Sequence, residues 1–354
     1  MSLLIYKSTK STRNNMIQVF RALSIIAVVM IHTTPSGEWQ VFCRPFINFS
    51  VATFLFLSGY LTKIENDNWY AFCKKRIIRV IIPYIIWTTV YTLPQILSGG
   101  SILLLVKNLI TAKSAAIMYY ILVYIQFVLL TPLLGNLAKS KYRCLGWFVA
   151  PIATLFFKYY GLLTGYEYNE YISLFWSNAC LGWFTYYYLG LLLGNKIIKP
   201  NYSLKILVWL YLVSILLQML EGFGWFLLGN GNCGTQIKFT SFITSIIFLL
   251  IVYNILNKPN IDIKSKFLRS LGDYSFGIYL CHIMIMMILG YMHYNAIIPY
   301  PLTSVIVILI SLVRKILMIR KYTVTYAYHF LIDAMNFAYQ SSISDLSDTS
   351  ILSL

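Results

Sequence analysis

The sequence predicts an all-α, polytopic integral membrane protein with about ten transmembrane helices and both termini in the cytoplasm. Of its 354 residues, 59% are hydrophobic and only 11% are charged, whereas an average soluble domain has about 25% charged residues. The mean hydropathy is +0.71. The basic residues, which give a net charge of +17, are spread between apolar stretches and do not form one patch. This distribution predicts contact with a lipid bilayer and no nucleic-acid partner.

Long apolar stretches define the predicted helices, because about 18 or more apolar residues can cross the hydrocarbon core of a bilayer. The predicted spans are, in chain order, Ile17–Thr33, Phe42–Leu61, Ile77–Leu97, Ala115–Leu134, Leu145–Gly161, Leu174–Ile198, Leu204–Leu228, Phe239–Leu256, Tyr274–Met292 and Ile297–Leu317. The fifth is the weakest, because Lys158 and Gly161 shorten it. Pro83 and Pro132 are expected to kink the third and fourth spans.

The distribution of lysine and arginine orients these spans. With the N-terminus inside, 22 of the 28 Lys and Arg residues fall in or beside cytoplasmic segments, and Arg21 falls within a span. The five on the outer side are Arg44, Lys107, Lys113, Lys158 and Lys238. This asymmetry over short loops is the positive-inside pattern. It gives 1–15 as a cytoplasmic N-terminal tail, 16–318 as the transmembrane domain and 319–354 as a cytoplasmic C-terminal tail, predicted to be disordered because it is polar.

An ionisable pair lies within the first predicted span. Eleven helical steps separate Arg21 from His32, which places the two side chains within about 20° of each other and about 16 Å apart along the axis. Ionisable side chains inside a membrane helix mark a functional site by default. The structural alternative is an arginine that reaches the headgroups and a histidine bonded near the other end. His32 can exchange a proton or accept an acyl group, and Arg21 suits a phosphate or carboxylate.

A cationic cluster precedes the third predicted span. Arg76 and Arg79 are three residues apart, so one helix face presents both guanidinium groups. From charge alone, the favoured interpretation is an ordinary positive-inside anchor. The functional alternative is a clamp for the phosphates of a cytosolic, nucleotide-like ligand.

Three further features are open to a structural or a functional interpretation. Ser58 and Gly59 are small and let a helix or a substrate approach closely, with packing the favoured explanation. Asp273 is a candidate N-cap of the ninth span. His282, about three turns further on, is either a second polar wall of the site or a core histidine bonded to a neighbouring helix. The six cysteines are scattered, so we predict no disulfide framework and no metal.

Taken together and in their order along the chain, these features resemble the acyltransferase-3 family of bacterial membrane proteins. The resemblance covers about residues 18–311. The family's patterns are similar to Arg21-x₁₀-His32, Arg76-x-x-Arg79, Ser58-Gly59-Tyr60 and the stretch Ser275–His282. Two features depart from the family. Gln18 stands where many relatives have an acidic residue, and the resemblance fades after Ser311, which we interpret as an altered C-terminus.

The resemblance implies transfer of an acyl group, usually acetyl, from cytosolic acyl-CoA to a hydroxyl of a cell-envelope glycan. The first span looks most like members associated with capsule or exopolysaccharide O-acetylation in the bacterial plasma membrane, whose acceptor is a polysaccharide or its lipid-linked precursor. The family implies these roles: His32 as catalytic base or acyl relay, Arg21 in support, Arg76 and Arg79 on the CoA phosphates, and Ser58, Gly59 and His282 as candidate lining residues. The alternative is an exopolysaccharide exporter of the same family, although a neutral glycan requires no phosphate clamp.

Overall fold

The described part of the chain is helical. A computed structural model describes residues 15–66, 68–258, 263–291 and 300–318, and these contain no strand. The helices are α1 (Asn15–Thr33), α2 (Glu38–Cys43), α3 (Ser50–Tyr60), α4 (Trp69–Leu97), α5 (Leu103–Thr111), α6 (Tyr119–Lys139), α7 (Val149–Thr154), α8 (Tyr160–Thr164), α9 (Glu170–Asn178), α10 (Phe184–Gly194), α11 (Leu204–Leu227), α12 (Phe239–Leu256), α13 (Lys266–Asp273), α14 (Ser275–Tyr291) and α15 (Leu302–Met318). The predicted tails 1–15 and 319–354 lie outside the described residues, apart from Asn15 at the start of α1.

Several of these helices are long and apolar enough to cross a membrane. Among the described residues six segments meet that condition, and a bent pair of helices makes a seventh if it counts as one span. The six are Asn15–Thr33, Glu38–Tyr60, Trp69–Leu97, Tyr119–Lys139, Leu204–Leu227 and Phe239–Leu256. The prediction of an all-α, multi-pass membrane protein is therefore confirmed. The number of about ten spans and the cytoplasmic termini stay predictions.

The other predicted spans fold as shorter or interrupted helices. The fifth contains α7, a π-helical turn over Leu155–Tyr159, and α8. The sixth is broken, because α9 ends at Asn178, Ala179 is extended, and α10 begins at Phe184. The ninth belongs to the bent pair α13 and α14, whose axes differ by 75°. Helix length alone therefore does not decide how these segments cross the bilayer.

The prediction that Asp273 caps the ninth span is wrong. Asp273 is the last residue of α13, Tyr274 follows it, and α14 starts at Ser275. The packing of α13 explains this helical ending. Gly272 lies so close to α1 that a side chain there would overlap the carbonyl oxygen of Gln18. The chain stays helical up to this contact and then bends into α14.

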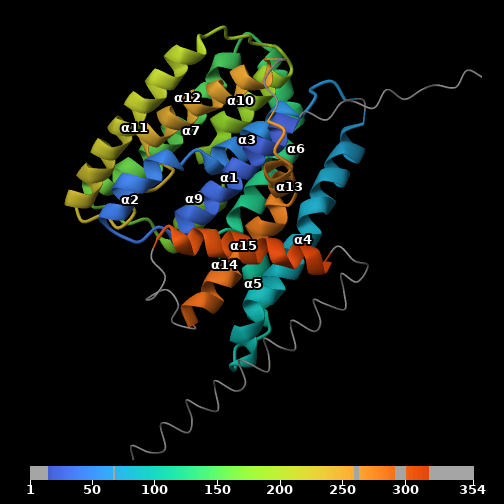
Figure 1. Ribbon diagram of the computed structural model, residues 1–354, viewed down its shortest axis with the longest axis vertical. Coiled ribbons are helices and arrows are strands. Elements are labelled where there is room, and N and C mark those ends of the chain that lie inside the picture. Colours follow the sequence, from blue (N-terminus) through green and yellow to red (C-terminus); the bar gives the residue numbers. More distant parts are fainter. Residues whose placement is uncertain (1–14, 67, 259–262, 292–299, 319–354) are drawn as a thin grey trace, which may run out of the picture.

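The first helix is central to the arrangement (Figure 1). Helices α3, α12, α13, α14 and α15 all contact α1, and most of its residues are buried. Figure 1 also shows α15 running across the view, whereas α1, α10, α11 and α12 are steeply inclined. A helix surrounded in this way can carry polar side chains that never meet lipid.

A second close helix contact involves α3 and α10. Side chains at Gly59, Gly190 or Gly194 would overlap backbone carbonyl oxygens of the opposite helix. Small residues at such crossings let two helix backbones approach within a bilayer, where apolar side chains gain little from leaving lipid. The contact fixes α3, and with it Ser58, against the centre of the protein.

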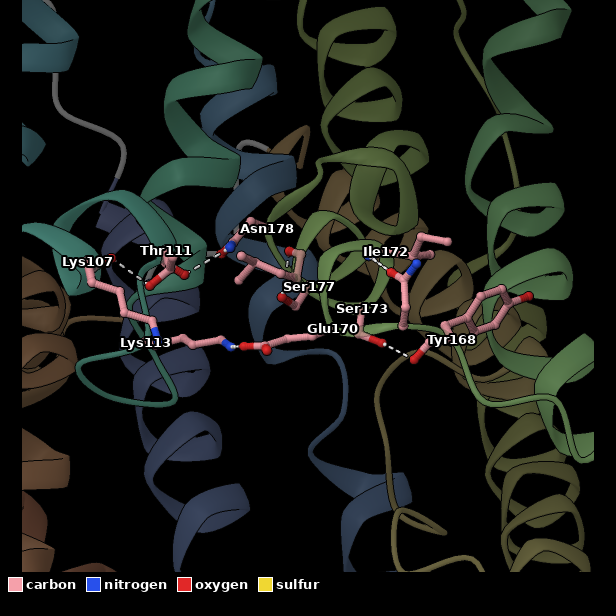
Figure 2. Close-up of polar contacts among 11 residues, drawn as sticks. Lys107, Thr111, Lys113, Tyr168, Glu170, Ile172, Ser173, Ser177 and Asn178 are labelled. Carbon is pink, nitrogen blue, oxygen red and sulfur yellow. Dashed lines mark hydrogen bonds and ion pairs between the residues drawn. The ribbon is translucent and has the colours of Figure 1, made fainter. Parts of the chain in front are cut away.

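Polar contacts join α9 to the end of α5 (Figure 2). Lys113 Nζ lies 2.9 Å from Glu170 Oε1, and Asn178 Nδ2 donates to the carbonyl oxygen of Thr111 at 2.9 Å. Through its hydrogen bond and charge, Lys113 lowers the pKa of the Glu170 carboxyl. The ion pair is exposed, so solvent screens it and it contributes little to stability. At the other end of α9, the half-buried Asn178 adds a second attachment, which solvent screens less.

We predict that the α3–α10 contact tolerates no side chain. Gly190→Ala should lower the free energy of unfolding by roughly 1–3 kcal/mol, the usual cost of overpacking. The new methyl group would meet the backbone oxygen of Phe56, which cannot rotate away. Thermal unfolding in detergent measures the effect. Gly224→Ala on α11 is the matched control, because its added atom meets open space. Equal unfolding midpoints for the two variants would contradict the prediction.

Candidate active site

A cavity of about 360 Å³ lies where α1, α3, α4, α6 and the α13–α14 bend come together. Its lining includes Arg21, Ser58, Arg76, Arg79, Tyr120, Tyr124, Asp273 and Tyr279. Four of the predicted site residues, from three separate helices, therefore line one cavity. Three of those four are arginines, which makes the cavity suited to an anionic group.

The helix α4 places both arginines of the cationic cluster on this cavity. It starts at Trp69 rather than at the predicted Ile77, and the side chain of Asn68 caps it by accepting from the Ala71 amide at 2.9 Å. The cluster is therefore helical, and residues three apart share a face. Arg76 and Arg79 both point to the cavity as that spacing predicts.

The two arginines of α4 differ in their surroundings. Arg76 Nη1 donates to Thr62 Oγ1 at 2.7 Å, and its guanidinium lies 4.5 Å from the centre of the Phe72 ring. Arg79 is exposed. Arg76 is thus held in place by the protein, while Arg79 is open to solvent at the edge of the cavity.

The two histidines of the predicted site are in contact. The ring centres of His32 and His282 lie 5.3 Å apart, at an interplanar angle of 51°. His282 is fully buried, and its Nδ1 lies 3.1 Å and 2.8 Å from the carbonyl oxygens of Ile278 and Tyr279. Both partners are acceptors, so we assign the proton to Nδ1. Nε2 is then an acceptor, and it is buried with no hydrogen-bond partner among the described residues.

Tyrosine side chains lie between the cavity and this pair. Tyr279 lines the cavity, and its ring centre is 6.0 Å from that of His282. The ring centre of Tyr120, which also lines the cavity, is 5.3 Å from that of Tyr279. The hydroxyl of Tyr279 donates to the carbonyl oxygen of Ile117. A continuous row of side chains therefore runs from the arginines through Tyr279 and His282 to His32, although His32 does not itself line the cavity.

Sequence reasoning missed the tyrosines and found the small residues. Tyr279 precedes His282 by three residues, so the helical period alone puts both on one face, and this signal was available. The two small residues separate: Ser58 lines the cavity, whereas Gly59 packs against the backbone of Tyr187. Gly59 therefore has a packing role in the structure.

Comparison with known proteins places the chain in a family. No curated protein and no solved structure matches the chain. The family model described as an acyltransferase domain, acyltransferase 3, matches residues 14–320. That range includes the arginine-lined cavity and both histidines. A match over most of the chain shows that the protein belongs to the acyltransferase-3 family and is an acyltransferase.

Proposed function

We propose that this acyltransferase moves an acyl group, most commonly acetyl, from cytosolic acyl-CoA to a hydroxyl of a capsular or other cell-envelope polysaccharide, or of its lipid-linked precursor. The proposed location is the bacterial plasma membrane. One observation carries the proposal. Arg21, Arg76 and Arg79 meet in a single cavity, and a row of side chains connects that cavity to two histidines in contact.

The cavity suits an acyl-CoA donor in two respects. Its arginines offer charge-assisted hydrogen bonds to phosphate, and Arg79 is exposed where a nucleotide would remain in water. The volume of about 360 Å³ fits the narrow pantetheine arm better than the adenine nucleotide. The thioester would then enter past Tyr120 and Tyr124, which line the wall.

The proposed reaction balances without a metal or a redox partner. The thioester C–S bond breaks, a C–O bond forms to the acceptor oxygen, and the hydroxyl proton ends on the CoA sulfur. His32 either holds that proton in transit or carries the acyl group on a ring nitrogen between the two substrates. His282 positions His32, because the rings are in contact and its own Nδ1 is bonded to carbonyl oxygens.

The proposed topology has about ten spans with both termini in the cytoplasm. The charge asymmetry supports it, and the short helices α7–α10 and α13–α15 supply the segments beyond the six long ones. In this orientation the arginine-lined cavity faces the cytoplasm, where acyl-CoA is made. His32 then lies toward the outer half of the membrane.

His32→Ala should lower acyl transfer by roughly 10²- to 10⁴-fold, the usual loss on removing a proton-transfer group. Proton NMR of the surface polysaccharide measures O-acetyl content, and immunoblotting checks protein abundance. Leu23→Ala is the control, because this α1 residue is exposed and outside the cavity. Full acetylation in the His32 variant would refute the proposed mechanism.

Arg79→Ala should weaken acetyl-CoA binding by roughly 10- to 150-fold, because a hydrogen bond to a charged group contributes about 1.5–3 kcal/mol. Arg79→Lys should recover part of the affinity, since an ammonium lacks the planar fork. Isothermal titration of the purified protein with acetyl-CoA gives the dissociation constants.

Lys74→Ala is the matched control for Arg79. It removes one charge from the same helix, and Lys74 is exposed and outside the cavity lining. If wild type and all three variants bind acetyl-CoA with equal affinity, the cationic cluster is a topology anchor and not a phosphate clamp. That result would favour the exporter alternative.

Cysteine labelling tests the topology. In a background without the six native cysteines, Lys74→Cys and Lys141→Cys should react with an impermeant maleimide only after permeabilisation. Lys107→Cys should react in intact cells, because it lies on the predicted outer side. Labelling of position 141 in intact cells would rule out the ten-span scheme.

A further inference from the structure

The C-terminal end of α1 carries a second group of polar contacts, which the arginine-lined cavity does not reach. Arg44 Nη2 donates to the carbonyl oxygen of Ile31 at 3.0 Å. The hydroxyls of Thr33 and Ser304 lie 2.6 Å apart. These contacts involve the residues on either side of His32, which is about 16 Å along the helix from Arg21 by the rise per residue. A ligand at this end of α1 would lie beyond His32 as seen from Arg21.

Arg44 has hydrogen-bonding capacity that the protein does not use. Its Nε is buried without a hydrogen-bond partner among the described residues, and no described carboxylate forms an ion pair with it. Arg44 also lies near the predicted outer end of Glu38–Tyr60, a segment long and apolar enough to cross a membrane, and an unpaired charge inside a membrane is costly and marks a functional site. A buried N–H donor without an acceptor costs free energy. The guanidinium of Arg44 is therefore suited to an acceptor atom of an incoming ligand.

Two amides beside Arg44 have unused acceptor atoms. Gln40 and Asn48 are 8% and 2% exposed, and Gln40 Oε1 and Asn48 Oδ1 have no hydrogen-bond partner in the described part of the chain. Both residues, like Arg44, pack against Gly234. A side chain there would meet Arg44 and Gln40, and the Asn48 amide donates to its carbonyl oxygen at 3.3 Å. Three residues with unused hydrogen-bonding atoms therefore share the backbone of Gly234 as a neighbour.

An exposed aromatic residue stands at the edge of this polar group. Trp39 is 53% exposed, and its ring centre lies 5.9 Å from that of Tyr300, edge to face. Tyr300 lies within electrostatic reach of Arg44. An open aromatic face beside an arginine and amides suits a sugar ring, whose C–H face packs on the aromatic ring while its hydroxyls take the hydrogen bonds.

We propose that Trp39, Arg44 and Tyr300 form the acceptor subsite, which binds a pyranose residue of the glycan beside His32. This inference rests on the proposed function. It places donor and acceptor at opposite ends of α1, so that only the acyl group has to pass the row Tyr279, His282 and His32. Arg44 and Trp39 are then specificity residues for the glycan and take no part in binding acyl-CoA.

Steady-state kinetics on membrane vesicles tests the subsite. The probes are acetyl-CoA and the host's surface polysaccharide after removal of its O-acetyl groups with mild base. For Trp39→Ala and Arg44→Ala we expect the KM for polysaccharide to rise by about tenfold, equivalent to 1.4 kcal/mol. The KM for acetyl-CoA should stay within a factor of about two. Trp39→Phe should recover most of the affinity, because it keeps an aromatic face.

Trp209→Ala is the matched control, since Trp209 is 66% exposed on α11 and should leave both KM values unchanged. If wild-type vesicles transfer acetyl groups while Trp39→Ala and Arg44→Ala keep the wild-type KM for polysaccharide, the subsite is refuted. Trp39 is then an interfacial anchor. A rise in the KM for acetyl-CoA in these variants would refute the subsite as well. Wild-type vesicles that bind acetyl-CoA but transfer nothing would instead refute the proposed function.

Discussion

The structure depends on keeping Arg21 and His32 inside one membrane helix. A charged residue at the centre of a helix costs about 2.5–3.5 kcal/mol on insertion, and only protein neighbours or a water-filled cavity reduce that cost. Among the described residues, α3 and α12–α15 pack against α1, and together with α4 and α6 they supply both. The α13–α14 bend and α4 form the cavity at Arg21, and His282 of α14 contacts His32. The surrounding helices therefore keep the polar side chains of α1 away from lipid.

Close backbone contacts bring those neighbours into place. Within lipid, helix association depends on packing and polar contacts rather than on hiding apolar surface from water. Gly272 lets α13 touch the backbone of α1, and Gly59 and Gly190 do the same for α3 and α10. The residue after Gly272 is Asp273, the one carboxylate among the described residues that line the cavity. One glycine contact therefore also sets the charge balance of the site.

The period of the α-helix explains which part of the site could be predicted from the sequence. A turn of about 100° per residue aligns Arg76 with Arg79, and both line the cavity. Contacts between distant segments lie outside such reasoning: His32 meets His282, and Arg44 meets the end of α1, only after the helices assemble. The break at Ala179 is of the same kind, because Asn178 bonds to Thr111 and to Gln126. Hydropathy marks this stretch as apolar and cannot show that tertiary hydrogen bonds interrupt its helix.

The two ends of α1 differ in chemistry, and this difference constrains any mechanism. At one end three arginines line an open cavity. At the other, the residues on either side of His32 bond to Arg44 and Ser304, and the segment that holds Arg44 also carries two buried amides and an exposed tryptophan. Phosphate binding needs the first environment and hydroxyl recognition needs the second. A single mixed pocket would have to hold a nucleotide and a glycan together within the membrane. Under the proposed function, separating the two environments along about 16 Å of helix would let the acyl donor and the glycan each stay in its own aqueous phase, and the histidines would handle only a proton and an acyl group.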